Sequence, residues 1–324
     1  LKLLKDISTN NALPPIEVSE EISKKIYKYP SSLNILKYAA KTYLPKLLEK
    51  LKLLLNISKK SDWHVAFLRS ENFMPNLEHR IIIQNPKKSF LADPFLIDHN
   101  KRTYCFVEEF CYEKNKGKIS SYLLSNDFAQ PLGTALEETF HLSFPFLIKH
   151  NNDIYMIPES ASNKDIRLYK NIEFPNKWIL EKVLMTNVDA ADTIVFKKDD
   201  KWFMLTNICS STLSDHQSEL HLFSSTDLIS DRWKPADHNP IIFNSLKARN
   251  GGYFKHKDNM YRVNQVHDKS HYGKKFEINL ITDIASDNFV EENLSIDLSD
   301  FFRAVKSSHH FDRTDSYVVF DFLE

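Results

Sequence analysis

The sequence contains very little glycine, only five residues in a chain of 324. An average usage of about 7% would give roughly 23. The five are Gly117, Gly133, Gly251, Gly252 and Gly273. Neither the dinucleotide-binding G-x-G-x-x-G nor the P-loop G-x-x-x-x-G-K-[ST] can be written with them. Folds that hold phosphates against bare glycine backbone are therefore excluded, and we expect no cofactor.

Long apolar runs, excess charge and paired cysteines are missing as well. No run of 18 apolar residues occurs, so the sequence predicts no membrane-spanning helix. Lys plus Arg and Asp plus Glu both number 43, and this balance argues against a dedicated nucleic-acid binder. The three cysteines form no C-x-x-C pair, which favours reduced thiols in a cytoplasmic protein.

Residues 1–60 are predicted to form a helical, locally basic extension. From Ser32 to Ile57 apolar residues recur at steps of three and four, with lysines between them, and Pro45 should kink or restart the helix. One interpretation is a linker helix packed on the main domain. The other is a membrane-surface helix over residues 33–57, which would make the protein peripheral at the inner face of the membrane.

The chain starts at Leu1 instead of Met. We expect that it is a fragment whose upstream domain is missing. A removed signal peptide would give the same start, but the unpaired cysteines argue against secretion.

Residues 61–324 contain an internal repeat of two β-type runs joined by a polar turn. The first runs of the copies begin at Asp93, Phe144, Asp192, Asn250 and His309, at steps of 51, 48, 58 and 59 residues. Each is followed by a second run, such as Tyr104–Glu109 or Tyr155–Glu159. Four strands per unit at a period of about 50 residues are the signature of a β-propeller.

The repeat therefore predicts an all-β fold, a five-bladed β-propeller over residues 61–324. The last copy has only two strands before the chain ends. We expect Trp63–Leu68 and Arg80–Gln84 to complete that blade, because ring closure by an N-terminal strand removes open sheet edges.

Polar residues recur at equivalent ends of the predicted strands. The starts of the first strands carry Asp93, His141, Asp192, Arg249 and His309, and the second strands end with Glu108 and Glu109, Glu159, Asn207, Gln265 and Asp321. The first strands of a propeller run along its axis, so these positions should converge at one end of the channel. We predict a polar pocket there.

The ordered motifs of residues 62–324 resemble a known family. They include Ala92-Asp-Pro-Phe95, Phe-Val-Glu-Glu ending at Glu109, His141-Leu-Ser-Phe-Pro-Phe146, Met156-Ile-Pro-Glu-Ser160 and Ala248-Arg-Asn-Gly251. Together they are similar to the propeller domain of plant glucosamine inositolphosphorylceramide transferases and their bacterial relatives. More distantly, the chain resembles five-bladed propeller glycosidases and fructosyltransferases, whose first blade carries a catalytic aspartate in an Asp-Pro pair.

The resemblance implies carbohydrate chemistry and suggests roles for the acids. Glycosyl transfer uses one carboxylate as base or nucleophile and an acid to protonate the leaving group. Asp93 is the candidate base or nucleophile, and Asp192 a carboxylate that orients it or tunes its pKa. Glu159 or Glu109 is the candidate acid, because no Glu-Gly-Pro-like segment follows Asp192 as it does in the glycosidases. The alternative for Asp93 is that Asp-Pro merely begins a strand.

Two arginines distinguish the enzyme hypotheses. Arg249 and Arg262 could clamp a phosphate or carboxylate of a nucleotide- or lipid-phosphate-linked sugar donor. Alternatively, they neutralise the acids as buried ion pairs. The other candidate substrate-binding residues are His141, Gln265, Tyr272 and His309.

No metal site is predicted. His267 and His271 have H-x-x-x-H spacing, but that spacing pairs two ligands only on a helix, and this segment has a loop composition. We expect hydrogen-bonding roles for these histidines.

The leading hypothesis is a glycosyltransferase of surface-polysaccharide or glycolipid synthesis, acting on a sugar donor and a glycan acceptor. The alternatives are a furanosidase-like propeller glycoside hydrolase and a non-catalytic glycan-binding module.

Overall fold

The computed structural model describes residues 31–40, 43–44, 62–210, 215–267 and 273–323. The chain divides into two compact units, residues 1–60 and 61–324. In the first unit a helix covers residues 32–40 and residues 43–44 are also helical, where the sequence predicts a helix. The rest of that prediction, residues 45–57, lies outside the described residues. Among the residues that the structure describes, no helix has the length and apolar content needed to cross a membrane.

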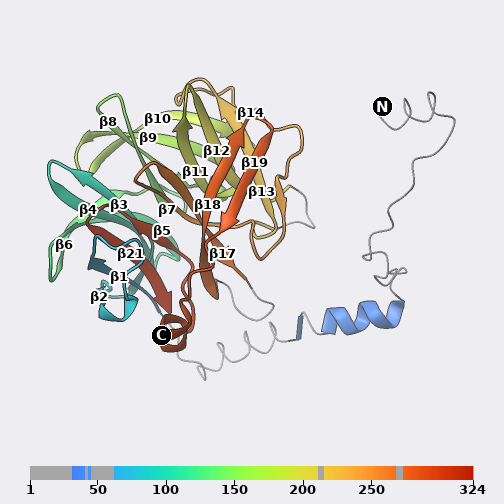
Figure 1. Cartoon of the computed structure of the whole chain (residues 1–324), viewed down its shortest axis with the longest axis horizontal. Helices are drawn as coiled ribbons and strands as arrows, with labels where there is room; N and C mark the ends of the chain where they lie inside the picture. Colours follow the sequence, from blue (N-terminus) through green and yellow to red (C-terminus); the bar gives the residue numbers. More distant parts are fainter. Residues whose placement is uncertain (1–30, 41–42, 45–61, 211–214, 268–272, 324) are drawn as a thin grey trace. The chain divides into compact units, whose positions relative to one another are not determined.

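The second unit consists of five antiparallel sheets and is a five-bladed β-propeller, as the sequence predicts (Figure 1). Blade 1 contains β3 (Ser89–His99), β4 (Arg102–Cys111), β5 (Lys116–Leu124) and β6 (Ala129–Leu136). Blade 2 contains β7 (Ser143–His150), β8 (Asp153–Glu159), β9 (Asp165–Glu173) and β10 (Lys177–Thr186). Blade 3 contains β11 (Ala190–Lys198), β12 (Lys201–Ile208), β13 (Glu219–Ser225), β14 (Lys234–Pro235) and β15 (Ile242–Phe243).

The remaining two blades bring the ends of the propeller together. Blade 4 contains β16 (Asn250–His256), β17 (Asn259–Val266), β18 (Lys275–Ala285) and β19 (Asn288–Asn293). Blade 5 contains β20 (Phe311–Arg313) and β21 (Tyr317–Leu323), followed in the sheet by β1 (Trp63–Arg69) and β2 (Ile81–Ile83). The short helices are η2 (Leu77–His79), η3 (Ala161–Asn163) and α3 (Ser299–Ala304).

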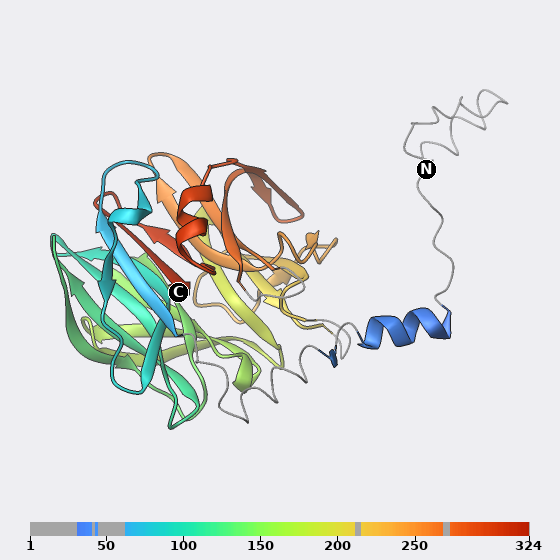
Figure 2. The ribbon, with the colours of Figure 1, turned by 90° about the horizontal axis from the view of Figure 1, so that it is seen from below.

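An N-terminal strand closes the ring. β1 pairs antiparallel with β21 over its whole length, from Trp63 opposite Leu323 to Arg69 opposite Tyr317. Figure 2 shows the light-blue strands of this segment beside the red strands near the C-terminus. Because the first and last strands share one sheet, the edge of β21 that faces away from β20 is paired and not left open.

The first two strands of a blade form a hairpin with a tight turn. The turns of blades 1 and 2 are Asn100-Lys101 and Asn151-Asn152, and all four residues have positive φ. Such turns match the right-handed twist of the strands, and asparagine tolerates positive φ better than most residues. The polar turns of the repeat therefore set the hairpin register.

The first strands of blades 1 to 4 also contain a bulge near their start. The pairing register shifts between Ala92 and Phe95 in blade 1 and at the corresponding places of blades 2 to 4. Asp93, Phe144 and Asp192 lie in these bulges with φ between 45 and 49°. Blade 4 uses Gly252 (φ 136°), where a side chain would collide with the Phe311 carbonyl of blade 5. A bulge re-aims its side chain, and in blades 1 and 3 it places Asp93 and Asp192 at the end of the channel.

Candidate functional site

A polar cavity of about 190 Å³ lies at the end of the channel where the first strands begin. Seven of the polar residues that the sequence places at these strand ends meet in it: Asp93, Glu108, His141, Glu159, Asp192, Arg249 and His309. The other lining residues are Trp63, Phe90, Ala92 and Ser143. The volume is below the range of about 300–1,000 Å³ typical of drug-sized ligands, so the cavity suits one small polar group.

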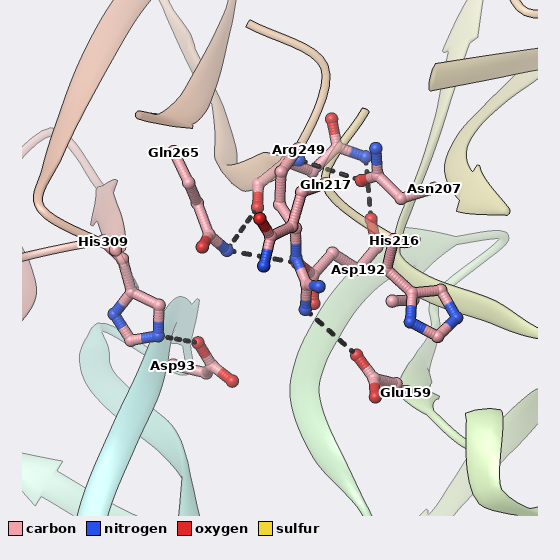
Figure 3. A network of polar contacts seen from close by, with 12 residues as sticks. Asp93, Glu159, Asp192, Asn207, His216, Gln217, Arg249, Gln265 and His309 are labelled. Carbon is pink, nitrogen blue, oxygen red and sulfur yellow. Dashed lines mark hydrogen bonds and ion pairs between the residues drawn. The ribbon is translucent and has the colours of Figure 1, made fainter. Parts of the chain in front are cut away.

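Arg249 connects three blades at the floor of the cavity (Figure 3). Its Nε donates to Asp192 Oδ2 at 2.5 Å, and its Nη2 lies 3.8 Å from Glu159 Oε2. Gln265 Nε2 donates to the same Asp192 oxygen at 3.1 Å. Asp192 is 2% exposed, and a carboxylate this deep needs such partners. Arg249 and Gln265 therefore fix Asp192 in place.

A second network joins Asp321, His309 and Asp93. Asp321 is fully buried and accepts the backbone N–H groups of His309, His310 and Asp93 at 3.0–3.1 Å. His309 Nδ1 lies 2.8 Å from Asp321 Oδ2, and its Nε2 lies 3.5 Å from Asp93 Oδ1. The imidazole is therefore held between two carboxylates, one deeply buried and one facing the cavity.

Neighbouring charges and hydrogen bonds outweigh burial in setting the charges of His309 and Asp321. It would lower the pKa of His309, but the charge and hydrogen bond of Asp321 outweigh it and raise that pKa. Burial would likewise raise the pKa of Asp321, yet His309 and the hydrogen bonds hold it below its usual value. Asp321 is thus an anion and favours a protonated His309 facing Asp93.

Three acids that face the cavity, Asp93, Glu108 and Glu159, have raised pKa values. Burial raises the pKa of Asp93 to about 7, and Asp192 and Asp321 add to the rise against the opposing charges of His309 and Arg249. Burial raises the pKa of Glu159 well above its usual value, with Asp192 adding to the shift and Arg249 opposing it. Burial also raises the pKa of Glu108 well above its usual value, and the charges of Asp93 and Glu159 add to the rise. The cavity therefore offers protonated acids near neutral pH.

His141 is neutral, and its partners assign its proton. Its Nδ1 accepts the Gly117 N–H at 2.9 Å, so the ring proton lies on Nε2, which is 3.6 Å from Glu108 Oε1. Burial lowers the pKa of His141. The ring can therefore donate from Nε2 toward Glu108 or toward a bound hydroxyl.

The structure places Glu109 outside the cavity, contrary to its predicted role as an acid. Successive residues of a strand point to opposite faces, and Glu109 accepts Ser120 Oγ at 2.6 Å and lies 3.5 Å from Lys118. Glu108 lines the cavity instead. The sequence holds a signal for this, because Glu108 and Glu159 each stand four residues after a tyrosine of the repeat.

Arg262 and Gln265 are also displaced from their predicted roles. Arg262 is fully buried and holds Glu291 with two hydrogen bonds of 2.7 and 2.5 Å. Arg262 thus forms a buried ion pair, but with Glu291 and not with the candidate acids, and it is not among the residues that line the cavity. Gln265 does not line the cavity either, but it donates a hydrogen bond to Asp192, which does. Tyr272 lies outside the described residues.

The remaining histidine prediction concerns His267 and His271. His267 Nδ1 accepts the Gly273 N–H at 3.0 Å, a hydrogen-bonding role, and His271 lies outside the described residues. Asp93, His309 and Asp321 bring potential metal ligand atoms within 4.8 Å of one another. However, the hydrogen bonds to Asp321 would have to break for it to bind a cation, so the geometry is that of a hydrogen-bonded triad.

The family model described as "Glucosamine inositolphosphorylceramide transferase 1, N-terminal" matches residues 79–315. The chain belongs to this family. The glucosamine inositolphosphorylceramide transferase 1 of Arabidopsis thaliana is 34% identical over 237 residues, which are 69% of this chain and 30% of that protein. The chain thus spans less than a third of the length of this curated relative.

Solved structures of two glycoside hydrolases have a similar fold. One is Zg3597, a family 117 glycoside hydrolase of the marine bacterium Zobellia galactanivorans, with a TM-score of 0.51 and 11% identity over 82% of this chain and 91% of that one. The other is a thermostable family-43 glycoside hydrolase, with a TM-score of 0.52 and 15% identity over 74% and 92%. At these identities the likeness concerns the fold alone.

Proposed function

We propose that this protein is a carbohydrate-active enzyme that holds one terminal sugar unit in the axial cavity and transfers it to a glycan or glycolipid acceptor. The observation that carries the proposal is the convergence of Asp93, Glu159 and Asp192 in one cavity, with only Asp192 bonded to an arginine at hydrogen-bond distance. Environments that separate the proton affinities of neighbouring carboxylates are the hallmark of acid–base pairs. The curated relatives are named transferases, which supports transfer as the reaction.

The roles follow from the surroundings of each acid. Glu159 keeps its proton at neutral pH because burial raises its pKa, so it acts as the acid that protonates the leaving oxygen. Asp93, whose pKa burial raises to about 7, changes charge near physiological pH and acts as base or nucleophile. Asp192 orients the site through Arg249. Glu108 and His141 bind sugar hydroxyls.

Hydrolysis is the second candidate, and one observation favours it. A phosphate-linked donor needs cationic side chains to bind its phosphate. However, Arg262 forms an ion pair with Glu291, and Arg249 forms ion pairs with Asp192 and Glu159. Any donor phosphate would have to lie outside the cavity. A neutral glycoside with water as acceptor needs no such clamp.

The test is turnover of a panel of nucleotide sugars, lipid-phosphate sugars and aryl glycosides, with and without glycan acceptors. We expect Asp93→Asn and Glu159→Gln to lower turnover by about 10²–10⁴-fold. Glu109→Gln is the matched control, because this neighbouring acid faces away from the cavity, and it should retain activity. Acceptor-dependent product supports transfer, whereas free sugar formed with water alone supports hydrolysis. Sugar binding without turnover of any donor would instead identify a glycan-binding module.

We also propose that the protein is cytoplasmic and that residues 33–57 contact the inner face of the membrane. The alternation of leucines and lysines in this segment supports the proposal. Co-sedimentation with vesicles should require anionic lipid and disappear on deletion of residues 1–60. Binding to neutral vesicles alone, or binding that survives the deletion, would contradict it.

A further inference from the structure

A second cavity lies at the opposite end of the channel, where the first strands end in their turns. Its volume is about 280 Å³. Its walls are largely aromatic and include Phe146, Phe196, Trp202 and Tyr253. Tyr253 stacks on Phe196 with ring centroids 4.7 Å apart and lies edge-on to Phe146. The proposed sugar chemistry does not use this cavity.

Four cations occupy equivalent positions around this cavity. Lys149, Lys197, Lys255 and Arg313 each stand in the same register of the first hairpin of blades 2 to 5, opposite Ile154, Trp202, Met260 and Val318. All four line the cavity. Bringing four like charges to one opening is unfavourable unless a counter-charge is bound.

The acids nearby do not cancel this charge. Asp98 holds the equivalent position in blade 1, where its carboxylate accepts the Thr103 hydroxyl at 2.5 Å. Asp312 lines the cavity and accepts the Leu96 N–H at 2.7 Å. The Lys149 ammonium donates to the backbone carbonyl of Asp98. Within the described part of the chain, no carboxylate forms an ion pair with Lys149, Lys197 or Lys255. The opening is therefore predominantly positive.

Two buried donors of this cavity have no partner within the described residues. Arg313 is 4% exposed, and its Nε and Nη1 donate to backbone carbonyls, including that of Phe73 at 2.7 Å. Its Nη2 meets no acceptor, and neither does the hydroxyl of Tyr253, which is 9% exposed. Buried donors are seldom left unpaired, because each unmade bond is unfavourable. An oxyanion would supply the acceptors that such donors lack.

We propose that this cavity binds a small organic oxyanion, a phosphate or carboxylate group carried on a planar apolar stem. The guanidinium of Arg313, the Tyr253 hydroxyl and the lysines would hold the anion, and the aromatic walls would pack against the stem. The volume is close to the lower end of the range for small-molecule sites, about 300 Å³.

Buried rings separate this cavity from the sugar cavity. Phe95 lines the second cavity, and its ring packs edge-on against His310 at 4.4 Å. His310 is fully buried, and its Nδ1 lies 3.8 Å from Asp93 of the first cavity. The oxyanion site is therefore independent of the proposed catalysis, and each can be tested without the other.

The experiment is calorimetric titration with phenyl phosphate and with benzoate, compared with benzyl alcohol as the neutral analogue and inorganic phosphate as the bare anion. We expect saturable binding of one or both organic anions at low salt, weakening as salt screens the lysines, and no binding of benzyl alcohol. Lys197→Gln/Lys255→Gln should weaken the anion at least about tenfold. Tyr253→Phe should weaken it severalfold while the protein stays folded.

The matched control is Lys198→Gln/Lys257→Gln, which removes the same charge from neighbouring residues outside the cavity lining. Asp93→Asn and Arg249→Gln report on the sugar cavity and should leave anion binding unchanged. If the two double lysine variants weaken anion binding equally, the effect comes from net charge alone, and the proposal is overturned. It is also overturned by loss of binding in Arg249→Gln alone when circular dichroism shows that this variant is folded, which would assign the anion to the sugar cavity. No saturation by either organic anion at millimolar concentration would also overturn it.

Discussion

Replacing Asp93 by asparagine should stabilise the protein at neutral pH while it removes activity. The Asp93 side chain is buried in the cavity, and its φ of 48° is one that asparagine adopts readily. Burial raises its pKa from 3.8 to about 7. The unfolded chain therefore releases this proton at lower pH than the folded protein does, so stability falls as pH rises between these two values.

The size of the effect follows from the pKa shift. Each unit corresponds to about 1.4 kcal/mol, so the shift of Asp93 to about 7 amounts to about 4 kcal/mol of unfolding free energy above that pH. The substituted asparagine carries no charge and escapes this loss. Asp93→Asn should thus match the wild type near pH 4 and exceed its stability by up to about 4 kcal/mol at pH 8.

Urea unfolding of both proteins between pH 4 and pH 8 measures this difference. The same substitution at the exposed Asp315 provides the control. A stability difference that is the same at every pH would refute the assignment of Asp93 as a buried carboxyl that ionises reluctantly. Turnover measured on the same samples separates the stability effect from loss of the base.

Further predictions concern the groups around this acid. Arg249→Gln leaves Asp192 buried without its 2.5 Å partner, and urea unfolding should show a loss of about 3–5 kcal/mol of stability. The control Arg303→Gln breaks an exposed ion pair and should lower the unfolding free energy by no more than about 1 kcal/mol. Arg262→Gln removes the ion-pair partner of Glu291 and should destabilise the fold by about 3–5 kcal/mol. Turnover per folded molecule should stay near that of the wild type. A selective loss of turnover would show that Arg262 takes part in the site. Turnover should decline as pH falls below about 7, because Asp93 takes up its proton there, and a pH–rate profile without this limb would exclude Asp93 as the base. Gly117→Ala should destabilise by about 1–3 kcal/mol and disturb sugar binding, because the added methyl group collides with the Leu142 carbonyl and approaches His141, as a melting curve would show.

Much of the architecture could be predicted from the repeat. Aromatic and β-branched runs joined by polar turns recur five times, and a strand's period and length are local properties of such runs. The same spacing placed Asp93, Asp192 and Glu159 at equivalent strand ends, and the structure brings them to one cavity. The bulges that aim Asp93 and Asp192 inward are not evident from the sequence pattern, because they depend on pairing with the second strand.

The assignments that differ in the structure share one cause. Glu108 and Glu109 are adjacent and chemically alike, and only the pleat and the partner strand decide which of them faces the channel. The sequence predicts Arg262 as a substrate-binding residue, but its partner Glu291 comes from β19, the outer strand of the same blade. Neither choice can be made from spacing alone.

The scarcity of glycine, the repeat and the motifs by themselves determined the fold, the end of the channel at which the acids gather and the family. Charge state was decided by the tertiary structure alone. Asp321 is a buried anion because three backbone N–H groups and His309 converge on it. Asp93 holds its proton up to about pH 7 because burial raises its pKa. Proton affinity depends on desolvation and on charges brought together from distant segments, and no local sequence pattern specifies either.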